Sequence, residues 1–303
     1  MSVCVVGSVA LDDIKTPQGE RKNLLGGAAL HFSNAASPLT QVNLVGVVGD
    51  DFPDDGIKLF KEKKVDYSGL EVISGGKTFH WSGYYENDMN TAHTVSTELG
   101  VFADFNPKIP DKFKKSKLLF LANIDPVLQL KVKKIMGDIF TMLDTMNFWI
   151  DSKRNELMEI IRLVDILLVN EGEARQLTGK KNLIEAAETL LSFGPKYVII
   201  KKGEYGVSIM GKDFYFSLPS FPVTNLVDPT GAGDSFAGGF IGYLASAGKM
   251  NKDSLKVALA YGTVIASFYV EGFGVEGFRN VKESEIKKRL AKFRKMITLP
   301  DNS

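Results

Sequence analysis

The 303-residue sequence predicts an α/β protein, with a doubly wound, mostly parallel sheet and a small β-sheet attached to it as a lid. Three observations support this fold class. Short apolar runs rich in Val, Ile and Leu alternate with stretches of helical periodicity along most of the chain. Two polar segments with strand-like character interrupt that rhythm. No internal repeat or linker divides the sequence, so residues 1–303 are expected to form one domain.

The apolar runs predict strands at residues 3–9, 42–48, 118–122, 148–151, 166–169 and 197–201. Helical patterns lie between them, at residues 26–37, 53–63, 126–143 and 183–192. Strands separated by helices of this length need crossover connections, which are right-handed and lead to parallel pairing. The pattern therefore predicts helices on both faces of an open sheet.

The two segments that interrupt the rhythm lie at about residues 12–25 and 77–97. The first is polar and contains a Pro-Gln-Gly turn. Within the second, Phe79 and Trp81 fall on one face of a strand, and His80 and Ser82 fall on the other. We expect the two segments to pair as a small sheet that closes over a ligand site. Two surface hairpins without function are the alternative.

Composition and charge argue against several classes of protein. The chain has 37 basic and 36 acidic residues, and a net charge of +1 is not the footprint of a nucleic-acid-binding protein. No apolar run is long enough to predict a membrane span, and the first strand lacks the basic start of a signal peptide. The single cysteine, Cys4, suits a reducing compartment, so we expect a cytoplasmic protein. His31, His80 and His93 lack metal-ligand spacing, and no zinc site is predicted.

The most informative stretch, residues 228–240, reads Asp-Pro-Thr-Gly-Ala-Gly-Asp-Ser-Phe-Ala-Gly-Gly-Phe. A strand-like run at 221–227 precedes it and a helical pattern follows, so Gly231, Ala232 and Gly233 are expected on a turn at a helix N-terminus. Free N–H groups and the helix dipole make such a turn an anion site. Asp234 suits this place if its carboxylate accepts a proton from a substrate hydroxyl as a phosphoryl group arrives. A glycine-rich loop with a helix-capping Asp is the alternative.

Two other nucleotide-binding patterns are incomplete. Residues 206–212 read Gly-x-x-x-x-Gly-Lys, as in a Walker A loop, but Asp213 stands where a magnesium-binding Ser or Thr is needed. The segment lies between two strand-like runs with no helix after it, so we interpret it as a hairpin. No Gly-x-Gly-x-x-Gly follows the first strand, which argues against a dinucleotide-dependent dehydrogenase.

The sequence closely resembles the ribokinase-like (PfkB) family of carbohydrate and nucleoside kinases. Residues 228–240 are similar to its C-terminal signature, with Pro229 in place of the usual Thr. The Gly-Gly-Ala-Ala at 26–29 and the Val-Gly-Val-Val-Gly-Asp-Asp at 45–51 resemble its N-terminal signature, and the Asn-Glu-Gly-Glu at 170–173 resembles its Asn-x-x-Glu element. The resemblance implies a ribokinase-like core, a β lid, MgATP and transfer to a primary alcohol. Lids of this family often clasp between two subunits, so a homodimer through the lid is expected.

The resemblance also implies roles on the nucleotide side. Asp234 matches the catalytic base, and the turn at Gly231, Ala232 and Gly233 matches the anion hole. Two further matches concern the nucleotide and its metal. Asn170 and Glu173 match the pair that organises Mg²⁺ through water, and Lys201 and Gly203 match the nucleotide-side turn. A lysine at residue 201 could reach a phosphate, or it could be a solvated strand end. Asp228 and a later turn at 271–274 match a K⁺ site behind the anion hole.

On the substrate side, Asp12 matches a carboxylate that grips two substrate hydroxyls. Gly26 and Gly27 match the glycine pair that packs against the substrate ring. His31 stands where many sugar kinases of the family have Asn, and Ala10 stands where ribose-specific members have Asn. These two departures argue against ribose itself as the substrate.

The sequence therefore predicts an ATP-dependent kinase that phosphorylates the CH₂OH group of a small sugar. A nucleoside kinase is the alternative, and it would need aromatic residues around the base, for which Trp81, Tyr84 and Phe102 are candidates. A catalytically idle relative that binds nucleotide is a further alternative. It has no chemical need for residues such as Asp234 and Glu173.

Overall fold

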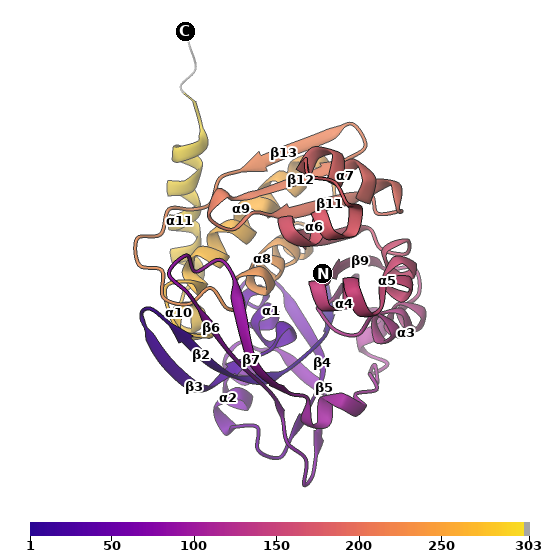
Figure 1. Ribbon diagram of the computed structural model, residues 1–303, viewed down its shortest axis with the longest axis vertical. Coiled ribbons are helices and arrows are strands. Elements are labelled where there is room, and N and C mark those ends of the chain that lie inside the picture. The colour runs from indigo at the N-terminus through magenta and orange to yellow at the C-terminus, as the bar shows by residue number, and fades with distance from the viewer. Residues whose placement is uncertain (300–303) are drawn as a thin grey trace.

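The computed structural model describes residues 1–299 of the chain. The polar sequence after about Leu299 predicts a frayed tail, and that tail lies outside the described residues. The main sheet consists of β1 (Ser2–Val6), β4 (Gln41–Gly49), β5 (Asp66–Ile73), β8 (Leu118–Leu121), β9 (Phe140–Asp144), β10 (Ile166–Asn170), β11 (Tyr197–Lys201), β12 (Val207–Gly211) and β13 (Phe214–Leu218). Their order is β13-β12-β11-β10-β9-β8-β1-β4-β5 (Figure 1). All pairs from β11 to β5 are parallel, and β12 runs antiparallel to both of its neighbours. The predicted doubly wound, mostly parallel sheet is confirmed.

Helices cover both faces of this sheet. One face carries α1 (Ala28–Ala36), α2 (Asp54–Glu62), α8 (Ala232–Ala247), α9 (Lys252–Tyr269), α10 (Glu276–Arg279) and α11 (Glu283–Ile297). The other carries α3 (Pro126–Met136), α4 (Asn147–Ser152), α5 (Arg154–Ile161), α6 (Glu171–Thr178) and α7 (Leu183–Ser192). Short 3₁₀ turns occur at η1 (Gly100–Asp104), η2 (Phe113–Lys115) and η3 (Gly203–Tyr205). No helix of the described residues is long and apolar enough to cross a membrane.

The central strands are apolar throughout because they are buried on both sides. In β1, Val3 and Val5 pack into the core under α1 and α8, whereas Cys4 and Val6 pack into the core under α3 and α5. All four side chains are fully buried. Successive side chains of a strand point to opposite faces, so a strand between two helical layers needs apolar residues at every position.

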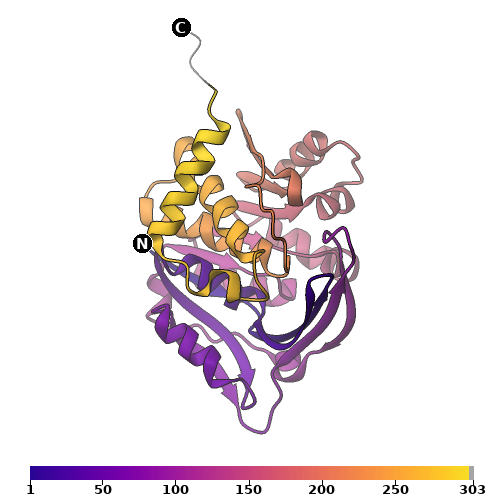
Figure 2. The ribbon, with the colours of Figure 1, turned by 90° about the vertical axis from the view of Figure 1, so that its left-hand side faces the viewer.

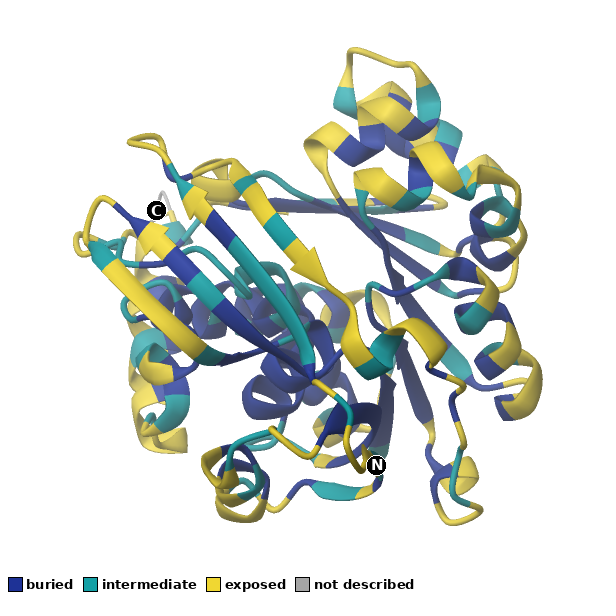
Figure 3. Ribbon diagram, turned by 60° about the horizontal axis from the view of Figure 1, so that its bottom comes forward, coloured by how far each residue is buried: buried dark blue, intermediate teal, exposed yellow. Residues whose placement is uncertain are grey.

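A second, four-stranded sheet stands beside the main domain (Figure 2). It consists of β3 (Gly19–Gly26), β2 (Ala10–Thr16), β6 (Phe79–Tyr85) and β7 (Ala92–Glu98), in that order. The two segments singled out in the sequence therefore do pair, through parallel β2 and β6. The outer strands β3 and β7 are mostly exposed, and β2 is mostly buried (Figure 3).

Three sequence predictions were wrong. Residues 140–143, predicted as the end of a helix, belong to strand β9, and residues 148–151, predicted as a strand, lie in helix α4. A short continuous apolar run has no periodicity that separates a buried strand from a buried helix. The strand-like run at 221–227 has no strand, and Pro222 has no N–H to donate to a ladder. The predicted hairpin is present, because β12 and β13 pair across the turn at 212–213.

Close helix packing explains the small residues in the middle of α8. A Cβ on Gly238 would lie 2.6 Å from the backbone oxygen of Phe32 in α1. A Cβ on Gly239 would lie 2.9 Å from the backbone oxygen of Tyr261 in α9. The two glycines thus allow α8 to pack tightly between two helices, which fixes where its N-terminus points.

Candidate active site

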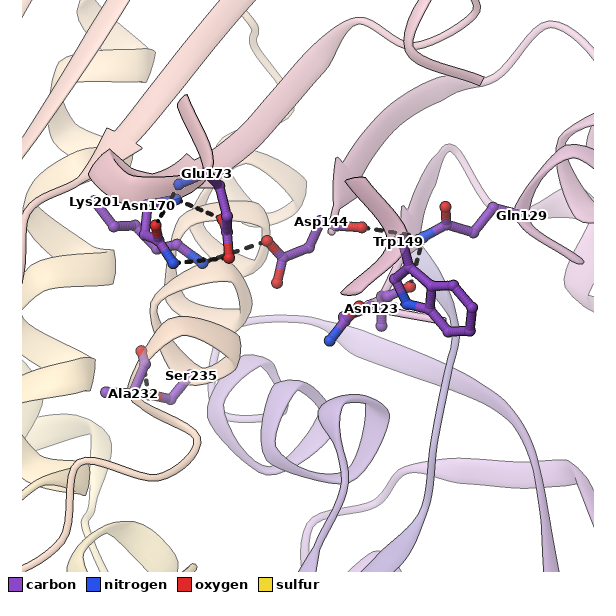
Figure 4. Close-up of polar contacts among 10 residues, drawn as sticks. Asn123, Gln129, Asp144, Trp149, Asn170, Glu173, Lys201, Ala232 and Ser235 are labelled. Atoms are coloured by element: carbon purple, nitrogen blue, oxygen red, sulfur yellow. Dashed lines mark hydrogen bonds and ion pairs between the residues drawn. The ribbon is translucent and has the colours of Figure 1, made fainter. Parts of the chain in front are cut away.

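The carboxyl ends of three neighbouring strands gather polar side chains at one edge of the main sheet. Asp144 ends β9, Asn170 ends β10 and Lys201 ends β11. The N-terminus of α8 lies opposite them (Figure 4). Open parallel sheets bind ligands at this edge, because the strand ends leave a crevice there.

The turn that begins α8 presents free N–H groups. Gly231 caps the helix in the left-handed conformation, with φ 73°, which favours glycine. The N–H of Ala232 donates to the backbone oxygen of Pro229 at 3.1 Å. Within residues 1–299, no protein acceptor takes the N–H of Gly231 or of Gly233. The free donors of the predicted anion hole are therefore those of the two glycines.

Side chains fill the space beside both glycines. A Cβ on Gly231 would lie 2.7 Å from the ring of His31, and a Cβ on Gly233 would lie 3.0 Å from Nζ of Lys201. Any other residue at these positions would displace His31 or Lys201. The turn is thus a cradle of N–H groups with an imidazole on one side and an ammonium on the other, an arrangement that suits a phosphate.

Asp234 lies in the first turn of α8, next to this cradle. Part of its surface remains open to solvent, as a base that meets a substrate requires. The surrounding protein disfavours its charged form and raises its pKa to about 7. Asp144 adds to this shift and Lys201 opposes it. A carboxylate with such a pKa is a better proton acceptor than an ordinary surface Asp.

Asn170 and Glu173 hold each other at the start of α6. The Glu173 carboxylate accepts the backbone N–H of Asn170 and its side-chain amide, both at 2.7 Å. The side-chain oxygen of Asn170 accepts the N–H of Glu173 at 2.9 Å. This is a capping box, which satisfies two helix donors at once. Burial raises the pKa of Glu173 to about 7, so its charge is poorly compensated by the protein alone.

Lys201 is not a solvated strand end. Its Nζ lies 3.3 Å from Oδ1 of Asp144, and only 20% of its side chain is exposed. The sequence analysis missed Asp144, because residues 126–143 were interpreted as a helix. The available signal was a carboxylate directly after the apolar residues Met142 and Leu143.

The substrate-side residues also meet. Gly26 pairs with Ala10 at the end of β3, and a Cβ on it would lie 1.9 Å from Oδ2 of Asp12. Nε2 of His31 is 4.0 Å from that same oxygen. Burial raises the pKa of Asp12 to about 8, with Asp228, Asp234 and Asp13 adding to the shift. Burial also lowers the pKa of His31 to about 4, so its ring is neutral.

His31 has unused hydrogen-bonding capacity. Neither ring nitrogen has a partner among the described residues, although both are buried. The ring packs edge-on against Tyr269, whose hydroxyl donates to the His31 backbone oxygen at 3.0 Å. Unpaired buried polar atoms are costly, so they call for an explanation such as a ligand.

Gly27 has a different reason to be glycine. It caps α1 with φ 91°, and a Cβ would lie 2.6 Å from the backbone oxygen of Ser8. That oxygen accepts the N–H of Ala29, and the Ser8 hydroxyl accepts the N–H of Ala28, both at 3.0 Å. Ser8 thus caps α1 from the loop after β1, a contact that the sequence analysis did not identify.

The small sheet touches both halves of the site. The hydroxyl of Tyr85, at the end of β6, lies 3.1 Å from the hydroxyl of Thr230 in the turn before α8. At the other end of the loop after β6, Oδ1 of Asn90 lies 3.3 Å from where a Cβ on Gly203 would be. The sheet therefore contacts the main domain beside the N–H cradle and beside the turn after β11.

Asp228 lies behind the cradle and is fully buried. Its Oδ1 accepts the N–H of Thr230 at 2.8 Å, and its Oδ2 accepts the N–H of Gly274 at 2.9 Å. The carboxylate thus joins the loop before α8 to the turn that the sequence analysis paired with it.

Trp81 lies on the same face of the small sheet as Asp12, and Phe102 stacks on Phe79, which strand alternation places on that face as well. Trp81 and Asp12 are direct cross-strand partners, whereas Tyr84 pairs with Lys15 on the opposite face. Tyr84 stacks on His93 at 4.9 Å between ring centroids. Phe102 is stacked between Phe79 and Phe105.

A cavity of about 1070 Å³ opens against the small sheet but does not include the polar cluster. Its lining includes Asp13, Lys15, Glu20 and Tyr84. Strand alternation places Asp13 and Lys15 on the face opposite Asp12. The cavity therefore lies mainly on the other face of the sheet.

Comparison with known proteins agrees with this arrangement. Residues 2–278 match the family described as pfkB family carbohydrate kinase. The chain is 32% identical to a cytidine kinase of Thermococcus kodakarensis over 267 residues, covering 86% of this chain and 94% of that protein. It is 25% identical to a ribokinase of Lactococcus lactis, covering 95% and 96% of the two chains.

A solved structure of an E. coli protein assigned as ribokinase II, in complex with ATP and Mg²⁺, superposes with a TM-score of 0.81. The identity is 21%, and the superposition covers 96% of this chain and 99% of that one. The structure supports the shared fold, and the sequence matches extend over most of the chain. The chain therefore belongs to the pfkB family of carbohydrate kinases.

Proposed function

We propose that this chain transfers the terminal phosphoryl group of ATP to the primary hydroxyl of a ribonucleoside. The observation that carries the kinase assignment is Asp234, a carboxylate of raised pKa beside the free N–H groups of Gly231 and Gly233. The 32% identity to a cytidine kinase favours a nucleoside as acceptor. A free sugar is the second candidate, which the resemblance to a ribokinase supports.

In the proposed reaction, Asp234 accepts the proton of the acceptor hydroxyl. The oxygen then forms a bond to the γ-phosphorus, the bond to the β–γ bridging oxygen breaks, and ADP leaves. The N–H groups of Gly231 and Gly233 and the ammonium of Lys201 would stabilise negative charge on the phosphoryl oxygens. Tyr85 and Asn90 would bring the small sheet over the site as a lid, which excludes water from the transfer.

Magnesium would neutralise phosphate charge when bound. Within residues 1–299, no group of three or more His, Cys, Asp or Glu side chains is placed to hold a metal ion. Mg²⁺ commonly keeps several waters and takes one or two carboxylates plus phosphate oxygens. Glu173, with its poorly compensated charge, fits that role, and we propose that it orders the metal through water together with Asn170.

The substrate would be gripped by Asp12 and His31. An ionised carboxylate offers two acceptor oxygens and therefore suits a vicinal diol, which supplies two O–H groups. With a pKa of about 8, Asp12 is mostly protonated at neutral pH in the absence of a ligand, and two O–H donors would lower that pKa by stabilising the charged form. The neutral ring of His31 can donate from one nitrogen and accept at the other. Because the ring lies close to both Asp12 and Gly231, it would lie between the diol and the phosphoryl group in the proposed complex. Trp81, on the face of Asp12, is an aromatic residue that could contact a base.

Substitution of the base tests the central assignment. In Asp234→Asn, kcat should fall by about 10²- to 10⁴-fold while ATP still binds, because the hydroxyl proton has no acceptor. Wild-type kcat/KM should fall as the pH drops below about 7, where Asp234 becomes protonated. Asp253→Asn, in the first turn of α9, is the matched control and should retain activity. Near-normal turnover by Asp234→Asn would rule out the assignment.

A second prediction concerns the metal. Glu173→Gln can keep the bond from the backbone N–H of Asn170, because Gln can replace Glu in a capping box, but it removes the negative charge and the acceptor of the Asn170 side-chain amide. The Mg²⁺ concentration for half-maximal rate should therefore rise, as measured by magnesium titration at saturating ATP. Glu285→Gln makes the same change in the capping box of α11, far from the site in sequence, and should leave the titration unchanged. An unaltered titration in Glu173→Gln would show that its role is helix capping alone.

A third prediction concerns a monovalent cation at Asp228. Among the described residues no cationic side chain pairs with this buried carboxylate, so K⁺ bound nearby would offset its charge and order the adjoining loop. Pro229 alters the loop relative to the family signature. The phosphorylation rate should be higher in KCl than in NaCl or tetramethylammonium chloride at equal ionic strength. Equal rates in all three salts would remove the cation from the proposal.

The fourth prediction concerns the diol. A 2′-deoxyribonucleoside should lose about 10- to 100-fold in kcat/KM relative to its parent, because a buried acceptor on Asp12 is left unpaired. Asp12→Ala should raise KM for the parent and reduce this discrimination. Asp13→Ala, the neighbour on the opposite face of the strand, is the control and should do neither. Equal use of both nucleosides by the wild-type protein would contradict the role of Asp12.

A further inference from the structure

Lys201 is held in the site by one carboxylate that comes from a different strand. Its Nζ lies 3.3 Å from Oδ1 of Asp144, and the strand β10 lies between the two parent strands (Figure 4). Asp144 is 5% exposed, so the pair is shielded from water. Shielding makes both the attraction and the geometry of such a pair matter more than at a surface.

The position of Asp144 is itself fixed from behind. Gln129 on α3 is fully buried, and its Nε2 donates to the backbone oxygens of Asp144 at 3.0 Å and of Ala122 at 2.8 Å. Gln129 thus joins the carboxyl ends of β8 and β9. The carboxylate of Asp144 is directed by a tied backbone and not by a flexible loop.

Three carboxylates lie close enough to Lys201 to interact with its charge. Burial acts to lower its pKa, but the charges of Asp144, Glu173 and Asp234 outweigh this effect and raise the pKa above its usual value. An ammonium is a compact point charge on a flexible stem, so it pairs with whichever carboxylate is nearest. Without Asp144, Lys201 could turn onto Asp234, where it would compete for the base and leave the N–H cradle.

We propose that Asp144 is a positioning residue that holds the ammonium of Lys201 beside Gly233, so that the lysine contacts the transferred phosphate and not Asp234. The inference rests on the proposed function, because it takes the cradle to be a nucleotide-phosphate site. The observation behind it is that Nζ of Lys201 lies 3.3 Å from Oδ1 of Asp144 and 3.0 Å from where a Cβ on Gly233 would be.

Two explanations of the ion pair predict opposite changes in nucleotide affinity when Asp144 is replaced. If Asp144 contributed only its charge, its removal would relieve repulsion and tighten the binding of an anionic nucleotide. If it positions Lys201, its removal releases the lysine and weakens binding. The affinity for AMP-PNP, a non-hydrolysable ATP analogue, separates the two without any need for turnover.

The experiment is a double-mutant cycle measured by titration calorimetry with AMP-PNP and Mg²⁺. Asp144→Asn and Lys201→Met should each raise Kd by about 10-fold, the effect of one charge-assisted hydrogen bond. The double variant should bind no more weakly than Lys201→Met, because Asp144 acts through the lysine. If Asp144→Asn proves unstable, Asp144→Ser provides the same comparison.

Asp165→Asn is the matched control. Asp165 and Lys196 directly precede β10 and β11, at the ends of these strands that lie away from the site, and they form an ion pair of 2.7 Å. The loss of Asp165 therefore removes a similar ion pair outside the site. Its AMP-PNP affinity should stay at the wild-type value even if its melting temperature falls. An equal loss of affinity in Asp165→Asn would make the effect of Asp144 a general loss of structure and overturn the inference.

Two further outcomes would also overturn it. One is unchanged or tighter binding of AMP-PNP by Asp144→Asn. The other is a loss of AMP-PNP affinity caused by Asp144→Asn that is just as large when it is introduced into the Lys201→Met variant. In both cases a wild-type protein that binds AMP-PNP leaves the proposed function standing. A wild-type protein that does not bind AMP-PNP would remove the proposed function and this inference together.

Discussion

The site depends on the crowding of charge at the N-terminus of α8. Asp234, Asp144 and Glu173 approach a single ammonium, that of Lys201, in a place with little water. Such a cluster is unfavourable unless it is held rigidly, because like charges repel strongly where the dielectric is low. The paired ends of β9, β10 and β11 supply that rigidity. The carboxylate of Glu173 also accepts hydrogen bonds in the capping box at the start of α6, which partly stabilises its charge. A polyanionic nucleotide with its metal would complete the balance.

Glycines decide what can enter this cluster. Those in the middle of α8 let the helix pack between α1 and α9, and those at its start make room for His31 and Lys201. Gly26 makes room for the carboxylate of Asp12 in the same way. The packing of α8, the N–H cradle and the carboxylate of Asp12 therefore all depend on glycines, and a side chain added at any of these positions would disturb the site.

Most of the fold and half of the site could be predicted from the sequence. The alternation of apolar runs and helices gave the doubly wound sheet, and residues 228–240 identified Asp234 and its cradle. Asp144 was missed because a five-residue buried strand has no periodicity to separate it from a helix. The sequence did not predict whether Lys201 is buried, because a lysine at the end of a strand is just as often exposed to solvent. The lack of partners for the ring nitrogens of His31 could not be predicted either. It results from packing of the ring against Gly231 and Tyr269, residues more than 190 positions away, which no local pattern encodes.

The release of ADP from MgATP, measured over a panel of ribonucleosides and free sugars, is the most direct test of the kinase assignment. At least one acceptor with a primary hydroxyl and a vicinal diol should raise ADP release well above the rate without acceptor. A ribonucleoside should do so more than a free sugar, with the phosphate on the primary hydroxyl. If no acceptor in the panel raised ADP release, the assignment of Asp234 as the base of a phosphoryl transfer would be contradicted.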